Sequence, residues 1–499
     1  MSRRALIRAA VRVTGPYIER ARRSGNTSAL RSPRMVDRMA KVGRWRMLTA
    51  YERALREVPA YREFVEATPR VPLVRWEPDF SVVPEIDKAT YVQRFSIESR
   101  CVGGKLPTQG VVIDESSGSS GTATNWVRGP GEREGVGQTM RAAIAATFGD
   151  EPLFVINAFA LGAWATGMHV TMSLADAVIV KSVGPDVAKI RNTITSFGPG
   201  YRYLICGYPP FLKRLVDSAD LDWSAYQCSA VCGGEGMSEG LRDYLSVAFR
   251  PIYSSYGASD LEINVGAETD FTIALRRALA ANPGLGEALG LPNHSLAPMI
   301  FQYNPLDYVV ETNRAGELVI TITRPDAVAP KIRYNIHDLG VAVPMQQVRS
   351  ALWAAGVRDI PPSTTALPLL FHYGRSDQTV AFYGANIAPG DLEAALFSLP
   401  ELARRVDGFA IVASEDAEAN KRLTFALELA AGETEPDNLK VVRQTLLARL
   451  AELNQDYREA ARMIPTGLEP TVVFHPHGTG PFEGADVRLK RDYMRTAGG

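Results

Sequence analysis

Short apolar runs alternate with helical stretches from Pro72 onward, and this alternation limits the architectures that the chain can adopt. Runs bounded by Gly, Pro or polar residues predict strands at 153–159, 176–183, 201–209, 226–234 and 250–257. Helical stretches at 185–197 and 209–219 lie between them. Such alternation is typical of an α/β fold in which helices cover layered sheets.

The chain is too long for one hydrophobic core. At 499 residues it is expected to fold as two or three parts. We predict a basic helical N-terminal part at 1–70, with helical periodicity over 35–66, and a large domain at 71–376. Within that domain, residues 271–300 predict a helical insertion, and period-two alternation over 307–343 predicts an antiparallel or mixed sheet.

A small α+β domain is predicted at 377–499, because the pattern changes after Gly374. Its expected elements follow in order as strand 378–384, helix 389–399, strands 407–413 and 422–429, helix 435–462 and strand 469–475. The two domains are expected to meet near Asp377. The chain is therefore predicted to have a large α/β domain followed by a small α+β domain.

Charge is balanced over the whole chain and uneven within it. Lys+Arg and Asp+Glu both number 55, so no global field favours nucleic acid as a partner. Residues 1–48 carry many more Arg and Lys than acids, and a basic helix there could contact an anionic membrane. A solvated N-terminal arm is the favoured interpretation.

Neither a secretory signal nor a membrane-spanning segment is expected. Pro16, Tyr17, Glu19 and Arg20 interrupt any apolar region after the first arginines, and no run of 18 apolar residues exists. The cysteines form no CxxC pair and do not cluster with histidines; they are Cys101, Cys206, Cys228 and Cys232. We therefore expect reduced core cysteines in a cytoplasmic protein.

A serine-glycine segment lies between an apolar strand at 111–113 and a predicted helix at 131–147. Glycines let a backbone fold closely around phosphate oxygens, and small hydroxyls supply donors without bulk. The candidate residues are Ser116, Ser117, Gly118, Ser119, Ser120, Gly121 and Thr122. No Lys follows the second glycine, so this is not a Walker A loop. A Ser/Gly run alone also fits a flexible linker, but the position between strand and helix favours a phosphate loop.

Further segments follow this loop in a fixed order, namely 233–245 with 253–260, then 316–340, then 373–389. Together they resemble, over roughly residues 50–499, the adenylate-forming superfamily of acyl-CoA synthetases, in particular its phenylacetate-CoA ligase branch. The resemblance implies a large AMP-binding domain and a small mobile C-terminal domain. It also implies that ATP and Mg²⁺ convert a carboxylic acid to an acyl-AMP with release of pyrophosphate, and that the acyl group passes to the thiol of coenzyme A.

The resemblance implies roles for individual residues. Residues 116–122 would hold the ATP phosphates. Gly233, Gly234 and Glu235 would lie beside adenine, with Tyr256 and Gly257 near the base. Asp260 would bind Mg²⁺, Asp338 the ribose hydroxyls, and Arg375 ribose and phosphate, while Asp377 would be the hinge. Asp260 stands where the family usually has Glu, but it keeps the oxygen ligand that Mg²⁺ requires. Taken singly, the two aspartates also fit turn residues and Arg375 fits a sheet edge.

Two departures from the family pattern are present. The family sequence RYRTGDL is RYNIHDL here, which retains Arg333 and Asp338. The family's C-terminal lysine, which bridges the substrate carboxylate and the α-phosphate, is replaced by Ala485. Lys490 is the candidate for that catalytic role, alongside Asp260 and Arg375, and a surface lysine is the alternative.

Aromatic side chains predict a flat apolar acid pocket. The lining residues would be Phe159, Trp164, Tyr208 and Tyr256, which favours an aryl or arylacetic acid, although aromatics in such segments also fit a core. His169 either orients the substrate carboxylate or is a core histidine with partners inside the protein, and the second interpretation is favoured.

The acceptor of the acyl group is the main open point. The resemblance implies that the small domain rotates about Asp377 and places Gly384 and Ala385 beside a pantetheine tunnel. Because Ala485 alters the usual apparatus, a carrier protein or an amine is the alternative acceptor. A nucleotide-binding protein without catalysis is a second alternative. A homodimer is left open.

Overall fold

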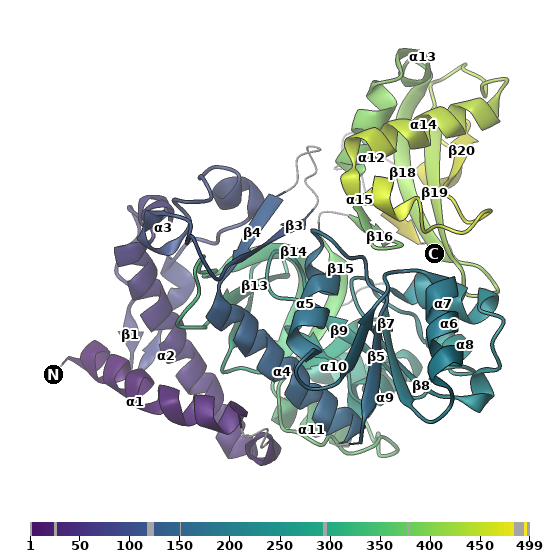
Figure 1. Cartoon of the computed structure of the whole chain (residues 1–499). Helices are drawn as coiled ribbons and strands as arrows, with labels where there is room; N and C mark the ends of the chain where they lie inside the picture. The colour runs from purple at the N-terminus through teal and green to yellow at the C-terminus, as the bar shows by residue number, and fades with distance from the viewer. Residues whose placement is uncertain are drawn as a thin grey trace. The chain divides into compact units, whose positions relative to one another are not determined.

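The computed structural model describes residues 2–23, 27–116, 124–149, 151–292, 297–376, 379–483 and 494–496. It has the predicted mixed α/β fold (Figure 1). The chain divides into two compact units, each built from segments far apart in sequence. Unit 1 comprises Met1–Asp114, Asn125–Ser182 and Tyr253–Gly374. Unit 2 comprises Glu115–Thr124, Val183–Ile252 and Arg375–Gly499. Asp377, the predicted domain boundary, lies outside the described residues, so that boundary stays a prediction.

Unit 1 begins with α1 (Arg3–Arg23), α2 (Pro33–Glu57) and α3 (Pro59–Phe64). The helical periodicity over 35–66 corresponds to two helices, α2 and α3. Val58 is extended, with φ −113° and ψ 104°, because a proline disfavours helical backbone in the residue before it. The N-terminal arm is a helix with one side packed on the protein, since Ile7 is buried.

The main sheet of unit 1 is largely antiparallel, as the period-two alternation predicts. Its strands follow the order β12-β13-β14-β15-β11-β10-β9. Their bounds are β9 Ile252–Tyr256, β10 Gly266–Ala267, β11 Met299–Tyr303, β12 Tyr308–Thr312, β13 Glu317–Ile322, β14 Tyr334–Val343 and β15 Leu369–Arg375. Gly266 pairs with Tyr256 on one side and Tyr303 on the other, which sets the register of the three strands nearest the candidate site.

The remaining elements of unit 1 flank this sheet in sequence. They are β1 Leu73–Val74, β2 Glu77–Pro78, β4 Thr124–Arg128, α4 Pro130–Phe148, β5 Leu153–Asn157, α5 Ala165–Leu174, β6 Ile179–Ser182, α9 Asp270–Ala281, α10 Pro283–Leu289 and α11 Met345–Ala354, with β3 Val112–Ser116 spanning the division. The predicted insertion at 271–300 is helical in α9 and α10, but Met299 and Ile300 already belong to β11. Phe271, Leu275 and Ile300 share one core, so the insertion packs on the sheet.

In unit 2 the central segment, Val183–Ile252, has the predicted alternation of strand and helix. Its elements are α6 Val187–Phe197, β7 Arg202–Gly207, α7 Pro209–Ser218, β8 Gln227–Cys232 and α8 Glu239–Leu245. Strands β7 and β8 are parallel, with Leu204 opposite Ser229. Parallel neighbours joined by a helix are usually covered on both faces, which explains the continuous apolar run of β7. Strand β8 alternates instead, with Cys228, Ala230 and Cys232 buried.

The C-terminal segment of unit 2 is the α+β module that the sequence predicts. Its elements are β16 Val380–Phe382, β17 Ala385–Ile387, α12 Pro389–Phe397, α13 Pro400–Ala403, β18 Val406–Glu415, β19 Lys421–Leu429, α14 Leu439–Leu453, α15 Gln455–Ala460, β20 Thr471–His475 and β21 Met494–Thr496. Its larger sheet has the order β20-β19-β18-β21, and helices α12 and α14 lie over it (Figure 1). One core cluster joins sheet and helices, including Phe425, Ile411 and Leu446.

Two predictions for this module are corrected. The strand expected at 378–384 is shorter and pairs with β17 in a hairpin whose turn is at Tyr383 and Gly384, both with positive φ. The helix expected at 435–462 breaks at Asn454, whose side chain caps α15 by accepting from Tyr457 N at 2.8 Å. Asn454 also donates to Asp391 at 2.8 Å, so a tertiary contact stabilises the break.

All four cysteines are buried in the described part of the chain and none of them is in a disulfide, as expected. Burial raises the pKa of Cys206 and of Cys228 to about 12, so neither is a reactive thiolate at neutral pH. Over the part of the chain that the structure describes, no helix combines the length and apolarity needed to cross a bilayer.

Candidate active site

Asp338 lies at the centre of a polar cluster in unit 1. It is on β14 and is only 5% exposed. The Tyr256 hydroxyl, at the end of β9, donates to Asp338 Oδ2 at 2.7 Å, and His372 Nε2 of β15 lies 3.3 Å from the same oxygen. The Tyr256 ring stacks on Phe301 of β11, with centroids 5.6 Å apart. Contacts from neighbouring strands thus hold both the carboxylate and the ring in fixed orientations.

Asp260 lies in the turn that follows β9. The Tyr334 hydroxyl donates to Asp260 Oδ2 at 2.7 Å, and Lys88 Nζ lies 3.8 Å from Asp260 Oδ1. Tyr334 begins the strand that carries Asp338, so β14 contacts the turn as well. A Cβ at Gly257 would meet the backbone carbon of Ile263 at 2.3 Å. The turn can therefore fold back this closely only with glycine at that position.

Arg128 ties the Asp260 turn to a buried carboxylate. Its two Nη atoms donate to the carbonyl oxygens of the residues on either side of Asp260, and its Nε donates to Asp114 Oδ2 at 3.1 Å. His169 Nε2 lies 2.8 Å from the same Asp114 oxygen. Burial alone would raise the pKa of Asp114, but the hydrogen bond with His169 and the Arg128 charge lower it below its usual value. The turn is therefore anchored by a buried ionic group.

This anchoring predicts a pH dependence of stability. A carboxyl whose pKa is lower in the folded state contributes stability that is present above its ordinary pKa of about 4 and is lost as pH falls through the folded pKa. The wild-type protein should thus be more stable than Asp114→Asn by the largest margin near neutral pH, and this difference in unfolding free energy should shrink in acid. Urea unfolding of both proteins over an acidic pH series measures it. A gap that widens in acid would contradict the assignment.

A second buried ion pair adjoins the same turn and has no counterpart among the sequence predictions. Arg324 donates to both oxygens of Glu262, at 2.8 Å from Nε and 3.1 Å from Nη2. The Tyr308 hydroxyl also donates to Glu262. Both side chains of the pair are almost fully buried. Because bidentate pairs have a defined geometry, this contact fixes the chain just after Asp260.

Lys331 is a further buried charged residue that sequence reasoning missed. Its Nζ lies 5.3 Å from the ring centre of Trp126, a cation–π contact. Burial, followed by repulsion from Arg128, lowers the pKa of Lys331 to about 7. No motif or periodicity marks this position, between Pro330 and Ile332, as a buried lysine, because lysines are usually exposed.

Glu235 connects separate segments of unit 2. It lies shortly after β8, and its side chain is fully buried. Its Oε1 accepts from the Gly384 backbone N–H, and its Oε2 accepts from Lys421 Nζ at 2.5 Å. Gly384 is in the β16–β17 turn, and Lys421 begins β19. Both carboxylate oxygens are therefore engaged by the C-terminal module.

The ring of Tyr208, the residue before α7, completes this contact. A Cβ at Gly234, where φ is +79°, would meet the ring at 2.8 Å, and a Cβ at Gly384, where φ is +86°, would meet it at 3.0 Å. Two glycines in left-handed conformation thus let the backbone approach the ring from both segments. Ser238 Oγ adds a hydrogen bond of 2.6 Å to Glu415 of β18.

Three other described candidates lie at or directly after the ends of strands. Ser116 ends β3, Gly233 directly follows β8, and Arg375 ends β15. Phe159 is buried and Trp164 half-buried in the connection from β5 to α5. His169 is in α5 with its Nε2 against Asp114, which is a core environment. In unit 1 the structure therefore brings Tyr256 and Asp338 into contact and places Asp260 against Tyr334, on the strand that carries Asp338. In unit 2 it groups Tyr208, Gly234 and Glu235.

Several candidates lie outside the described residues. They are Ser117, Gly118, Ser119, Ser120, Gly121, Thr122, Asp377, Ala485 and Lys490. The phosphate loop, the hinge and the C-terminal lysine therefore stay predictions from the sequence.

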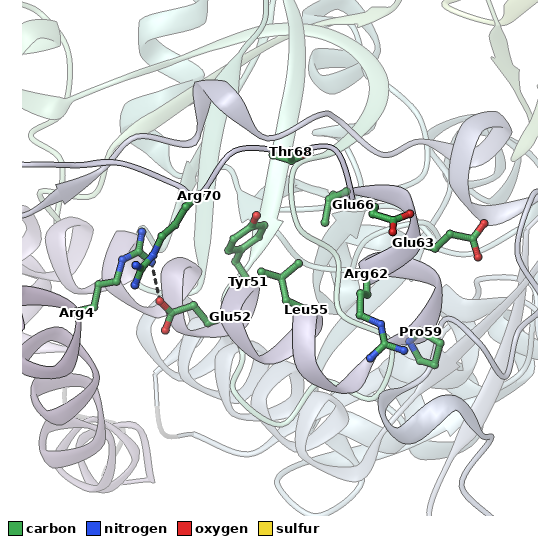
Figure 2. A pocket seen from close by; sticks show the side chains of 11 residues that line it. Arg4, Tyr51, Glu52, Leu55, Pro59, Arg62, Glu63, Glu66, Thr68 and Arg70 are labelled. Carbon is green, nitrogen blue, oxygen red and sulfur yellow. Dashed lines mark hydrogen bonds and ion pairs between the residues drawn. The ribbon is translucent and has the colours of Figure 1, made fainter.

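One pocket of unit 1, of about 690 Å³, is shown in Figure 2. Side chains of both charges line it, including Arg62, Glu63 and Glu66, and the ion pair of Arg4 with Glu52 lies at one side. None of the candidate residues above lines it. Among the described residues, no three His, Cys, Asp or Glu side chains are grouped so that they could hold a metal ion.

No family model and no curated protein sequence matches this chain. Among solved structures, it is similar to 2-hydroxyisobutyryl-CoA ligase in complex with 2-HIB-AMP and CoA in the thioesterification state, with a TM-score of 0.63 and 14% identity over 91% of this chain and 89% of that chain. The same ligase in the postadenylation state with 2-HIB-AMP gives a TM-score of 0.52 at 14% identity, over 92% of this chain and 90% of that one. The chain therefore has the fold of an adenylate-forming acyl-CoA ligase.

Proposed function

We propose that this protein is a cytoplasmic acid–thiol ligase of the phenylacetate-CoA ligase type. It would use ATP to convert a carboxylic acid to an acyl-AMP and pass the acyl group to the thiol of coenzyme A. The observation that carries the proposal is the contact of the Tyr256 hydroxyl with Asp338 Oδ2 at 2.7 Å, on a fold shared with an acyl-CoA ligase. These are the residues that the motif order assigns to the base and the ribose.

In the first half-reaction, an oxygen of the substrate carboxylate attacks the α-phosphorus, and the bond to the bridging oxygen of pyrophosphate breaks. Asp338 would accept hydrogen bonds from the ribose hydroxyls. Its contacts with Tyr256 and His372 already hold the Asp338 carboxylate in a fixed orientation. Two anions approach each other in this step, so groups that oppose the charge lower the barrier. Arg375, the loop 116–122 and Lys490 are the proposed sources.

Mg²⁺ would enter with ATP, and Asp260 is the residue that fits it. One carboxylate together with phosphate oxygens and waters is the ligand set that Mg²⁺ commonly takes in nucleotide sites. The metal would supply charge neutralisation at the phosphates. Asp260 is held in place from both sides, by Tyr334 at 2.7 Å and by the Arg128 contacts to its neighbouring carbonyls. Lys88 Nζ, at 3.8 Å, keeps the carboxylate paired in the absence of the nucleotide.

In the second half-reaction, the CoA sulfur attacks the acyl carbon and AMP leaves as its phosphate anion. The resemblance places Gly384 and Ala385 beside the pantetheine arm. Support comes from the contact of Gly384 with Glu235 and with the Tyr208 ring, which are candidates for adenine and for the acid. The buried aromatic rings of Phe159 and Tyr208 favour an aryl or arylacetic acid.

Asp338→Asn is the variant that tests the proposal. The substitution keeps the shape but removes the charge, and hydrogen bonds to a charged group are worth about 1.5–3 kcal/mol. Acid-dependent ATP–pyrophosphate exchange, measured with the best acid from a panel of aryl and aliphatic acids, should fall on the order of 10- to 100-fold. Asp326→Asn, at an exposed position, is the matched control. No exchange with any acid in the wild-type protein, or full exchange in Asp338→Asn, would reject the assignment.

A carrier protein or an amine is the second candidate for the acceptor, because Ala485 replaces the family's lysine. Consumption of the acyl-AMP with and without CoA distinguishes the acceptors. Release of AMP that CoA accelerates supports the thiol ligase. AMP release that requires an amine or a phosphopantetheinylated protein and ignores CoA supports the alternative.

A further inference from the structure

Positive charge is concentrated at the N-terminal end of a chain that is neutral overall. Lys+Arg and Asp+Glu both number 55, yet residues 1–48 contain thirteen Arg and Lys against two acids, Glu19 and Asp37. The rest of the chain is therefore acidic by the same excess. This segregation places a local positive field around α1 and α2 without making the whole protein basic.

Helix α1 presents apolar side chains to solvent within this basic segment. Leu6, Val13 and Tyr17 are 42%, 63% and 73% exposed, and their spacing of seven and four residues puts them on one side of the helix. Ile7, which is one residue further round the helix, is 1% exposed. Arg12 and Arg20 are exposed beside the apolar stripe. The helix thus has one apolar side packed on the protein and a second that the protein leaves uncovered.

The β1–β2 hairpin extends the stripe. Val74 and Trp76 at its tip are 60% and 39% exposed, and Arg75 lies between them with φ +54°. The Arg3 guanidinium of α1 lies 5.9 Å from the Trp76 ring centre, so the start of the helix and the hairpin tip are neighbours (Figure 1). Lys41 Nζ of α2 lies 5.3 Å from the ring of Trp45, whose Nε1 donates to Trp76 O at 2.9 Å.

We propose that this N-terminal face, made by the exposed side of α1 and the β1–β2 hairpin, docks on an anionic lipid bilayer. Arginines beside an exposed apolar stripe match the two layers that such a surface offers, phosphate headgroups and the outer acyl region. Tryptophan with an adjacent cation suits the boundary between them. Nucleic acid could pair with the arginines but would leave the apolar side chains of Val13, Tyr17 and Val74 without an apolar partner. A second copy of this chain would bring the same positive charge to the face, and the two faces would repel each other.

This inference does not rest on the proposed ligase activity. It assigns the protein a place of action, where a membrane-held acid or a lipid-exposed product would be within reach of the chain. The interaction is with the surface of the bilayer. Because electrostatic attraction draws the face to the lipid, binding should weaken as salt rises.

Co-sedimentation of the full chain with vesicles tests the proposal. At low salt the protein should sediment with phosphatidylcholine vesicles that contain phosphatidylserine and stay in solution with phosphatidylcholine alone. Val13→Asp/Tyr17→Asp should bind about tenfold more weakly, because charges enter the apolar stripe. Trp76→Ser should weaken binding to a lesser extent. Val247→Asp, equally exposed at 69% in unit 2, is the matched control and should bind like the wild-type protein.

Far-UV circular dichroism and gel filtration of each variant separate the face from folding. Equal binding of the wild type and the folded double variant would overturn the proposal, as would equal binding to neutral vesicles. Two other results would also overturn it. One is a dimer that the double variant dissociates; the other is DNA or RNA binding that the anionic vesicles fail to compete with.

Discussion

Arg128→Met should lower the free energy of unfolding by about 3–5 kcal/mol, the usual cost of removing one partner of a buried ion pair. Arg128 and Asp114 have side chains only 4% and 2% exposed. The substitution leaves the Asp114 carboxylate without its guanidinium and removes the donors of the two carbonyls beside Asp260. Because the Asp260 turn loses its anchor, ATP–pyrophosphate exchange should fall at least as far as in Asp338→Asn. Differential scanning calorimetry and the exchange assay measure the two effects.

Arg94→Met is the matched control, since Arg94 pairs with Glu63 at 3.5 Å with both side chains more than half exposed. Exposed pairs contribute about 0–1 kcal/mol, so this variant should be close to the wild type. A double variant, Asp114→Asn/Arg128→Met, should be less destabilised than the two single variants predict together, because the uncompensated charge is gone. Strict additivity would show that the two side chains act separately.

Lys421→Met should separate the two half-reactions. The substitution leaves the buried Glu235 carboxylate with only the Gly384 N–H as a charge-stabilising donor among the contacts described above. If this contact holds the C-terminal module for thioester formation, transfer to CoA should fall on the order of 10- to 100-fold. Breaking a buried ion pair costs several kcal/mol, and the partial exposure of Lys421 keeps the expected loss at the lower end of that cost. ATP–pyrophosphate exchange should change by less than about threefold. Single-turnover transfer from preformed acyl-AMP measures the first quantity.

Lys440→Met, at an exposed position of α14, is the control for the loss of a lysine from the same module. Glu235→Gln should restore much of the transfer when combined with Lys421→Met, since a neutral amide tolerates the missing ammonium. Equal losses of exchange and transfer in Lys421→Met would mean that the contact supports the site as a whole. Such a result would remove the idea that it selects one half-reaction.

Local patterns in the sequence were sufficient for most strands and helices. β7, β8 and β9 follow the predicted runs within a few residues, because short apolar runs bounded by Gly and Pro have few other solutions. The errors fall where a single residue overrides a longer pattern. Asn454 divides the predicted helix at 435–462 into α14 and α15, with a tertiary hydrogen bond to Asp391.

The candidate site was predictable where chemistry follows motif order and not where it depends on distant contacts. Tyr256 and Asp338 were assigned from their motifs, and the structure places them 2.7 Å apart across 82 positions of sequence. Arg128, Glu262 and Lys421 were missed. Each acts through a partner far along the chain, and no periodicity or spacing marks an arginine that bonds to carbonyls more than a hundred residues away.

The order in which the chain leaves the ribosome has a consequence for unit 2. Its central segment, Val183–Ile252, is complete long before Arg375–Gly499 exists, yet Glu235 accepts hydrogen bonds from Gly384 and Lys421 of that last segment, and Gly384 lies against the Tyr208 ring. During synthesis these contacts of Glu235 and Tyr208 can therefore form only after the last segment has emerged. We expect arrested chains that stop before β16 to be protease-sensitive in 183–252 and to recruit chaperones there, whereas full-length chains become protected late and in a single step.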